Sequence, residues 1–349
     1  MGLTRAALAV TLALILPVAA LAETIRIATY SPDLTRRGPG LLLRDILSGD
    51  DPQIAAAAEV IAHVEPDVIL LTGFDWDLEG RALDAFASLL ATDGLDMPHR
   101  FAAQPNSGMA TDADLDGDGR TGTPRDSQGY GEFTGQEGMP VMSGLPLGEV
   151  TDYSATLWRD LPDALIPEGG APDIQRLSTT AHWDVPVQVG AQALHLLAWS
   201  ATPPVFDGPE DRNGRRNHDE AVFWLDHLPA DAPWVLVGNS NLDPEDGEGR
   251  RDAIARLLTV AQDPRPAGEW QPPQSGANAT HRGDPARDTA DWDDEDGDPG
   301  NMRVDLILPA QGLEVAGSGV VWPDPETKLG AAVATASRHR LVWVDLALP

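Results

Sequence analysis

The stretch WVLVGNSNLDP, residues 234–244, is the most informative about the fold. Its first five residues form an uninterrupted apolar run, which is typical of a strand buried on both faces. Polar residues follow from Asn239 onward, and Pro244 closes the stretch. The sequence therefore predicts a central, buried strand over 234–238.

Further strands and a few helices are predicted on both sides of this stretch. Strands are expected over 25–30, 68–71, 139–143, 174–183, 193–200, 303–308, 313–322 and 340–348. Helices are expected over 53–64, 80–90, 251–258 and after a capping box at 217–220. Many strands, few helices and no linker between two cores predict a single layered domain of α/β or α+β class.

Two of these helices have clear start signals. Asp51 is a good N-cap, and Pro52 suits the first turn of the helix that follows it. Asn217-His-Asp-Glu220 has the pattern of a capping box, in which Asn217 is the N-cap and Glu220 the third helical residue.

The bulk composition limits the class of protein. The chain has 349 residues, of which 42% are hydrophobic, and no cysteine. This excludes a disordered chain and means that the core must be stable without disulfides. The formal net charge is −31, and the 24 cations are almost all Arg. Such a field repels phosphate backbones, so nucleic acid is disfavoured as a partner.

The first 22 residues have the pattern of a secretory signal peptide. Arg5 supplies a short positive region, residues 6–19 are almost all apolar, and Ala20-Leu-Ala22 supplies small residues for cleavage. An uncleaved membrane anchor is the alternative, which Pro17 disfavours. No other apolar run is long enough to span a bilayer. We therefore expect a secreted or periplasmic protein whose mature domain covers 23–349, with a net charge of −32.

A long polar loop, residues 106–138, contains a candidate calcium site. Loops of this length usually bind something or are disordered. Its acidic residues have the spacing of the first half of an EF-hand-type calcium loop; they are Asp114, Asp116 and Asp118. Counted from Asp114, the closing Glu of such a loop is replaced by Arg125. A weak calcium site and a bare, solvated acidic loop both fit this pattern.

Five stretches, in this order, resemble the endonuclease/exonuclease/phosphatase family along the whole mature chain. They are IRIATYS (25–31), PDVILLTGFD (66–75), VLVGNSNLDP (235–244), RVDLILP (303–309) and SRHRLVWVDL (337–346). The third resembles the family's G-D-x-N motif and the last its terminal S-D-H motif. The segment 202–220, TPPVFDGPEDRNGRRNHDE, further resembles an exported bacterial subgroup. The resemblance implies a single four-layer sandwich, two β-sheets flanked by helices, with a phosphoester hydrolase site at one end.

The family site holds a hard divalent cation, usually Mg²⁺, on carboxylate and amide oxygens. An Asp in D-x-N activates water, and a His oriented by another Asp stabilises the transition state. By resemblance, three site residues survive here: Asn241, Asp305 and His339. Five positions are substituted: Ser31 for Asn, Gly73 for Glu, Ser200 for His, Asn239 for Asp and Arg338 for Asp.

Arg338 has the largest expected consequence for the metal. A guanidinium a few Å from a divalent ion is repulsive by on the order of several kcal/mol. Arg338 and Gly73 together replace two anionic ligands, and Asn239 replaces the general base. We therefore expect Mg²⁺ not to bind at the family position. Arg338 itself is a candidate for binding an anion, and a salt bridge to a neighbouring Asp is the alternative.

Two principal functions follow. The first is a catalytically impaired pseudoenzyme, an exported binding or scaffold protein for an unknown small molecule or protein. The second is an active metal-dependent phosphoesterase with shifted ligands, acting on small phosphate esters or phosphodiesters. Its replacement acids would be Asp75, Asp77 or Asp243. A nuclease is the least attractive form of it because of the charge.

A third function is a metal-free hydrolase with a Ser-His-Asp site. Ser31 or Ser200 would be its nucleophile, beside His339 and Asp305. The sequence contains no G-x-S-x-G nucleophile elbow, which disfavours this interpretation. Segment 202–220 is dense in hydrogen-bonding groups and is expected to be paired internally rather than to line a ligand site.

Overall fold

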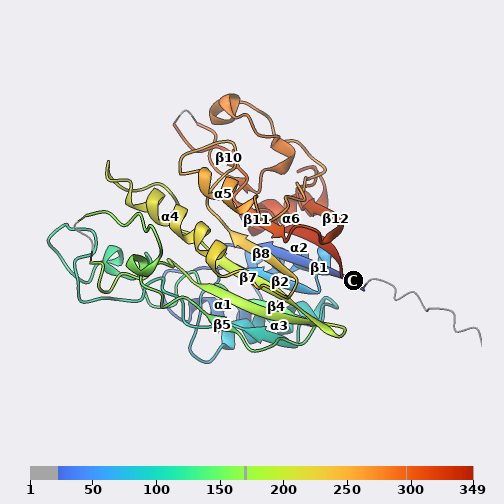
Figure 1. Ribbon diagram of the computed structural model, residues 1–349. Coiled ribbons are helices and arrows are strands. Elements are labelled where there is room, and N and C mark those ends of the chain that lie inside the picture. The colour runs from blue at the N-terminus through green and yellow to red at the C-terminus, as the bar shows by residue number, and fades with distance from the viewer. Residues whose placement is uncertain (1–22, 169–170, 296, 349) are drawn as a thin grey trace, which may run out of the picture.

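Two mixed β-sheets form the centre of the computed structural model, which describes residues 23–168, 171–295 and 297–348 (Figure 1). The first sheet has six strands, in the order β12 (Glu314–Val320), β13 (Val342–Leu348), β1 (Glu23–Tyr30), β2 (Val68–Leu71), β4 (Val141–Ser143) and β3 (His99–Phe101). The second has five, in the order β11 (Asp305–Pro309), β8 (Trp234–Asn239), β7 (Gln192–Ser200), β6 (His182–Val189) and β5 (Thr151–Asp152). A short pair, β9 (Ala290–Asp291) and β10 (Asn301–Met302), stands apart from both.

Helices cover the outer face of each sheet. On the six-stranded sheet they are α1 (Leu41–Ser48), α2 (Pro52–Val64), α3 (Arg81–Thr92) and α6 (Lys328–Ala336). On the five-stranded sheet they are α4 (Arg212–Val222) and α5 (Asp252–Leu257). One apolar cluster fills the space between the sheets, and one lies under each set of helices. The predicted four-layer sandwich is confirmed.

Side-chain alternation explains how each sheet takes part in two layers. In β2, Val68 and Leu70 belong to the cluster between the sheets, whereas Ile69 and Leu71 belong to the cluster under the helices. Successive side chains of a strand point to opposite faces, so an unbroken apolar run is the pattern that a doubly covered strand requires.

The predicted start of α2 is confirmed, and that of α4 is wrong. Asp51 accepts hydrogen bonds from the backbone N–H groups of Gln53 and Ile54, as an N-cap should. In contrast, Asn217 lies inside α4, which begins five residues earlier at Arg212. The Asn217 amide donates to the carbonyls of Thr202 and Ser240 instead.

The predicted strand over 174–183 is also wrong in its first part, because β6 begins only at His182. The carbonyls of residues 176, 177 and 178 accept hydrogen bonds from the Arg216 guanidinium, so they are not available to a neighbouring strand. Helices α1 and α6 were not expected from the sequence. Among the described residues, no helix is both long and apolar enough to cross a membrane; the predicted signal peptide, 1–22, lies outside them.

Candidate functional site

Three predicted site residues lie in one row across the end of the five-stranded sheet. Ser200 is beside Asn239 in the parallel pair β7–β8, and Asn239 is opposite Asp305 in the antiparallel pair β8–β11. His339 comes from the turn between α6 and β13, and its Nδ1 lies 2.7 Å from Asp305 Oδ2. The fold therefore brings these four residues together, although the first and the last of them are more than a hundred residues apart in the sequence.

His339 and Asp305 form a buried pair. Burial alone would lower the pKa of His339, but the neighbouring Asp305 carboxylate outweighs it and raises that pKa above the ordinary value. The pair of charged His339 and Asp305 therefore stabilises the fold at pH values below the ordinary pKa of His. This contribution is lost as the pH rises through the raised pKa of His339. Asp305 Oδ1 is buried and has no hydrogen-bond partner among the described residues.

Gly73 and Ser31 approach the same site from the six-stranded sheet. The strands that precede them, β1 and β2, are parallel and aligned, with Tyr30 beside Leu71. Gly73 has a φ of +63°, which residues with a side chain rarely adopt. A Cβ at this position would also lie 3.1 Å from Ser31 Oγ. Glycine therefore suits this backbone, and a side chain there would require Ser31 Oγ to shift by a few tenths of an ångström.

The position of the family's general base holds an amide that is already engaged. Asn239 Oδ1 accepts a hydrogen bond of 2.8 Å from the backbone N–H of Asn241. Asn241 has a φ of +47°, and its side-chain amide donates to the carbonyl of Ala201 at 2.7 Å. Both Asn side chains thus hold the backbone after β7 and β8 in place.

The serine hydroxyls do not complete a catalytic triad. Ser31 is buried and Ser200 is half-buried, but neither hydroxyl makes a hydrogen bond to His339 in the part of the chain that the structure describes. A triad requires the nucleophile within hydrogen-bond reach of its base. The geometry gives the metal-free Ser-His-Asp interpretation no support.

Residues 290–294, which we call the covering segment, lie across His339. Ala290 forms an antiparallel bridge with His339, and the Trp292 ring packs edge-on at 5.8 Å from the imidazole. The Asp291 carboxylate accepts a hydrogen bond of 2.5 Å from Arg340. These contacts leave His339 only 8% exposed.

Arg338 points outward to the same covering segment. Its guanidinium pairs with the Asp293 carboxylate at 3.1 Å, and both side chains are more than half exposed. The backbone carbonyl of Arg338 accepts from the N–H of Asp291. The structure thus shows the salt bridge to a neighbouring Asp that was the alternative to anion binding.

Comparison with known proteins decides the family. A model described as "Endonuclease/Exonuclease/phosphatase family" matches residues 45–339. The chain belongs to the endonuclease/exonuclease/phosphatase family. A search of curated proteins gives no significant match.

Solved structures of the endonuclease/exonuclease/phosphatase family share the fold at low identity. A protein of this family from Beutenbergia cavernae is 19% identical with a TM-score of 0.57, over 93% of this chain and 72% of its own. One from Leptotrichia buccalis is 14% identical with a TM-score of 0.55, over 92% and 99%. Sphingomyelinase C from Streptomyces griseocarneus is 18% identical with a TM-score of 0.50, over 93% and 99%. These similarities concern the architecture.

The three acids considered as replacement ligands of the family metal are each bonded to the backbone. Asp75 accepts from Thr35 and from the N–H groups of Arg36 and Glu137. Asp77 accepts from three N–H groups at the start of α3. Asp243 accepts from three N–H groups, of residues 245, 246 and 303. Their carboxylates therefore hold the loops around the family site in shape.

Sequence reasoning missed Asp33, which contacts the residues that precede His339. Its carboxylate accepts hydrogen bonds from Ser337 Oγ at 2.8 Å and from the backbone N–H of Arg338 at 3.3 Å. Its charge also helps to raise the pKa of His339. Asp33 has a φ of +52°, but no motif of the sequence marks it as a site residue.

The candidate calcium loop has three acidic side chains close together. One carboxylate oxygen from each of Asp114, Asp116 and Asp118 lies within 4.8 Å of the others. Among the described residues, this is the one group of three or more His, Cys, Asp or Glu with that spacing. The loop is shaped by backbone N–H groups that bond to the same carboxylates, such as Gly117 and Gly119 to Asp114.

Segment 202–220 contains a buried polar network under the family site. The Glu220 carboxylate accepts from the backbone N–H groups of Thr179 and Thr202, both at 2.6 Å. Arg216, one turn earlier in α4, binds four backbone carbonyls. The segment is therefore paired, but mainly with residues 128 and 176–179 outside it rather than internally as expected; of the bonds named, only the one from Thr202 to Glu220 stays within it.

Proposed function

We propose that this protein is an exported, catalytically impaired member of its family, which acts by binding a small molecule or a protein rather than by hydrolysing phosphoesters. The backbone at Gly73 carries this proposal. A carboxylate ligand there would need a side chain on a residue with φ of +63° and with Ser31 Oγ 3.1 Å from its Cβ. Such a conformation costs on the order of 1 kcal/mol or more for a residue other than glycine.

Two further features support impaired catalysis. Asn239 replaces the Asp that would activate water, and a neutral amide does not accept a proton near neutral pH. The covering segment packs Trp292 against His339 and joins Asp293 to Arg338, so the approach to the imidazole is occupied by this chain itself. A ligand of the protein therefore binds either after displacing the covering segment or on another surface.

Export is proposed from the sequence pattern of residues 1–22. The net charge of −31 disfavours nucleic acid as the bound partner, since binding would not release counterions through neutralised phosphates.

The protein comprising residues 23–349 is expected to hydrolyse a generic phosphodiester no faster than a protein-free blank in the presence of Mg²⁺ or Mn²⁺. The physical reason is that the general base and two anionic metal ligands are replaced, and a base alone contributes roughly 10²- to 10⁴-fold to such a rate. Turnover is measured spectrophotometrically, and metal binding by calorimetry.

Asn239→Asp serves as the matched variant in this assay. It restores the base without the metal ligands, so it is expected to stay inactive. Saturable Mg²⁺ or Mn²⁺ binding with metal-dependent turnover by the parent chain would refute impaired catalysis.

An active phosphoesterase with shifted ligands is the second candidate, and Asp33 is the observation in its favour. It is an acid beside His339 and Ser337 that no family motif requires. Its substrates would be small phosphate esters or phosphodiesters. If metal-dependent turnover is found, Asp33→Asn should abolish it under this alternative.

We also propose that the loop holding Asp114, Asp116 and Asp118 binds Ca²⁺ weakly. Sites of this kind in extracellular modules have dissociation constants of roughly 10⁻⁴ to 10⁻³ M. Asp116→Asn is expected to reduce the heat of Ca²⁺ binding that a calorimetric titration measures in this concentration range. Asp112→Asn, at an exposed position just before the three aspartates, is the control. An unchanged titration of Asp116→Asn would contradict this site.

A further inference from the structure

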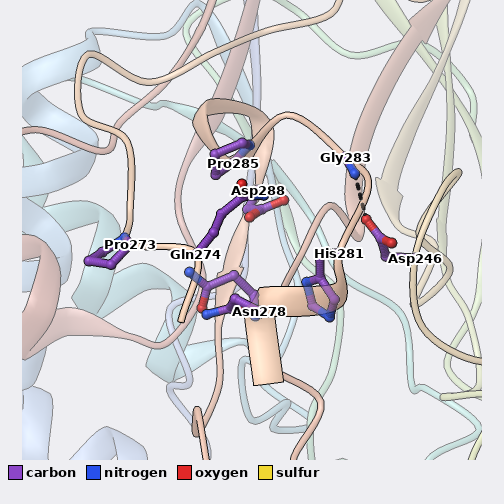
Figure 2. Close-up of a pocket in the computed structure, with 9 residues that line it drawn as sticks. Asp246, Pro273, Gln274, Asn278, His281, Gly283, Pro285 and Asp288 are labelled. Atoms are coloured by element: carbon purple, nitrogen blue, oxygen red, sulfur yellow. Dashed lines mark hydrogen bonds between the residues drawn. The ribbon is translucent and has the colours of Figure 1, made fainter. Parts of the chain in front are cut away.

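A polar hollow lies between the loop after β8 and the segment of residues 273–301 (Figure 2). Asp246 enters it from the loop, and Asn278, His281, Asp288 and Asn301 enter it from the segment. None of these residues belongs to the family positions described above. Figure 2 shows the Asp288 side chain among the labelled residues that line the hollow.

Asp288 is a largely buried acid that has no partner among the described residues, and its carboxylate oxygens keep some contact with solvent. It is only 8% exposed, and no side chain or N–H among the described residues makes a hydrogen bond or ion pair with its carboxylate. The arginines around it are engaged elsewhere, because Arg287 pairs with Asp284 and Arg303 with Asp263. A buried carboxylate normally has a cation or hydrogen-bond donors beside it.

Asn301 gives a second and independent sign of a missing ligand. It is 3% exposed, lines the same hollow, and its Oδ1 has no hydrogen-bond partner in the described ranges. Its position is fixed, since its backbone N–H donates to Asn278 Oδ1 at 2.6 Å and the Asn278 amide donates to Asp294 at 2.7 Å. A buried amide oxygen without a donor is costly unless something occupies the space in front of it.

The charge around the hollow has one sign. Burial and the nearby carboxylates of four acids raise the pKa of Asp288 to about 8; the four are Asp243, Asp246, Asp284 and Asp291. Of these, Asp246 is stabilised by the N–H groups of Arg282 and Gly283. At neutral pH this environment favours a proton or a bound cation at Asp288 over the bare carboxylate.

We propose that this hollow binds one hard divalent cation through the Asp288 carboxylate and the Asn301 amide oxygen. Carboxylate and amide oxygens are the donors that Ca²⁺, Mg²⁺ and Mn²⁺ prefer, and the absence of a thiolate from this cysteine-free chain disfavours softer metals. His281 and Asp246 line the same hollow. This site is independent of the impaired catalysis proposed above.

A cation at Asp288 would fix the covering segment. Thr289, next to Asp288, accepts hydrogen bonds from the N–H groups of Val304 and Asp305, and Ala290 pairs with His339. Asp288 therefore leads directly into the contacts that cover the family site. Cation binding at the hollow would link the loop after β8 to the position of the covering segment.

The experiment is a thermal unfolding series of the whole mature chain in EDTA, Ca²⁺, Mg²⁺ or Mn²⁺, supported by calorimetric titration with the metal alone. At a cation concentration of about 100 times the dissociation constant, we expect the Tm of the parent chain to rise by about 5 °C. Asp288→Asn keeps the shape of the side chain but removes its charge, and the rise in Tm is expected to disappear. In EDTA this variant should be at least as stable as the parent, because repulsion among the acids is relieved.

Two controls separate this site from other acids. Asp298→Asn lies in the same segment at an exposed position and should keep the full rise in Tm. Asp116→Asn removes one carboxylate of the candidate calcium loop. This variant should also keep the part of the rise in Tm that depends on Asp288. If Asp288→Asn does not fold, Asn301→Ala is tested in its place, with the same expected loss. The proposal is overturned if the variants at 288 and 301 keep the rise in Tm, or if the Asp116→Asn protein shows none.

Discussion

The Arg216→Met variant is expected to have a free energy of unfolding about 3–5 kcal/mol below that of the parent chain. Arg216 is buried in α4, and its guanidinium donates to the carbonyls of Gln128, Leu177 and two residues beside Leu177. Methionine fills much of the same volume but leaves these carbonyls without donors. It also leaves the buried Glu220 carboxylate without the cation whose charge favours its ionised form.

The measurement is denaturant unfolding at neutral pH, with Arg44→Met as the matched control. Arg44 makes an exposed ion pair with Asp45, so the control should change the unfolding free energy by less than about 1 kcal/mol. Arg216→Met combined with Glu220→Gln should be less destabilised than the sum of the single variants, because the unpaired charge is removed. A loss below about 1 kcal/mol for Arg216→Met would contradict the assigned role of the guanidinium.

Gly238→Ala is expected to destabilise the fold by about 3 kcal/mol or more, and the effect is steric. Gly238 has a φ of +147°, and a Cβ there would lie 1.8 Å from the carbonyl oxygen of Trp199 in the adjacent strand. Because backbone atoms of two paired strands cannot move apart without breaking their hydrogen bonds, the added methyl group must separate β7 from β8 locally. This separation occurs beside Ser200 and Asn239, at the row of family positions.

Gly312→Ala is the control for this prediction. Gly312 also has a positive φ, of +90°, but a Cβ there meets nothing within 4 Å. Its substitution therefore reports backbone strain alone, which costs on the order of 1 kcal/mol. Equal losses for the two variants in denaturant unfolding would show that the close approach to Trp199 is not the cause.

The layered fold could be predicted because its central strands are local patterns. The apolar runs at β2 and β8 require burial on both faces, and Asp51 with Pro52 defines the start of α2. These signals depend on the residues of one segment. The order of the five family stretches then indicated which strand ends meet, and the contact of His339 with Asp305 at 2.7 Å agrees with that expectation.

The start of α4 and the covering of His339 could not be predicted, because both depend on residues that are distant in sequence. Asn217 has the pattern of an N-cap, but buried carbonyls of Thr202 and Ser240 take its amide hydrogens inside the helix. The covering segment is an acidic stretch whose composition suggests a solvated loop. Only the folded chain brings its residue Trp292 against His339 and its residue Asp293 to Arg338.

The turn at Gly73 bears on how readily a carboxylate could arise at this position in evolution. A single codon change can replace glycine by glutamate, but the new side chain would arise on a backbone that has already adapted to having none. Ser31 would have to give way and the peptide after β2 would have to rotate before a carboxylate could reach the site. Under the proposed function, lineages descending from this chain are therefore expected to diversify its surfaces rather than gain hydrolysis.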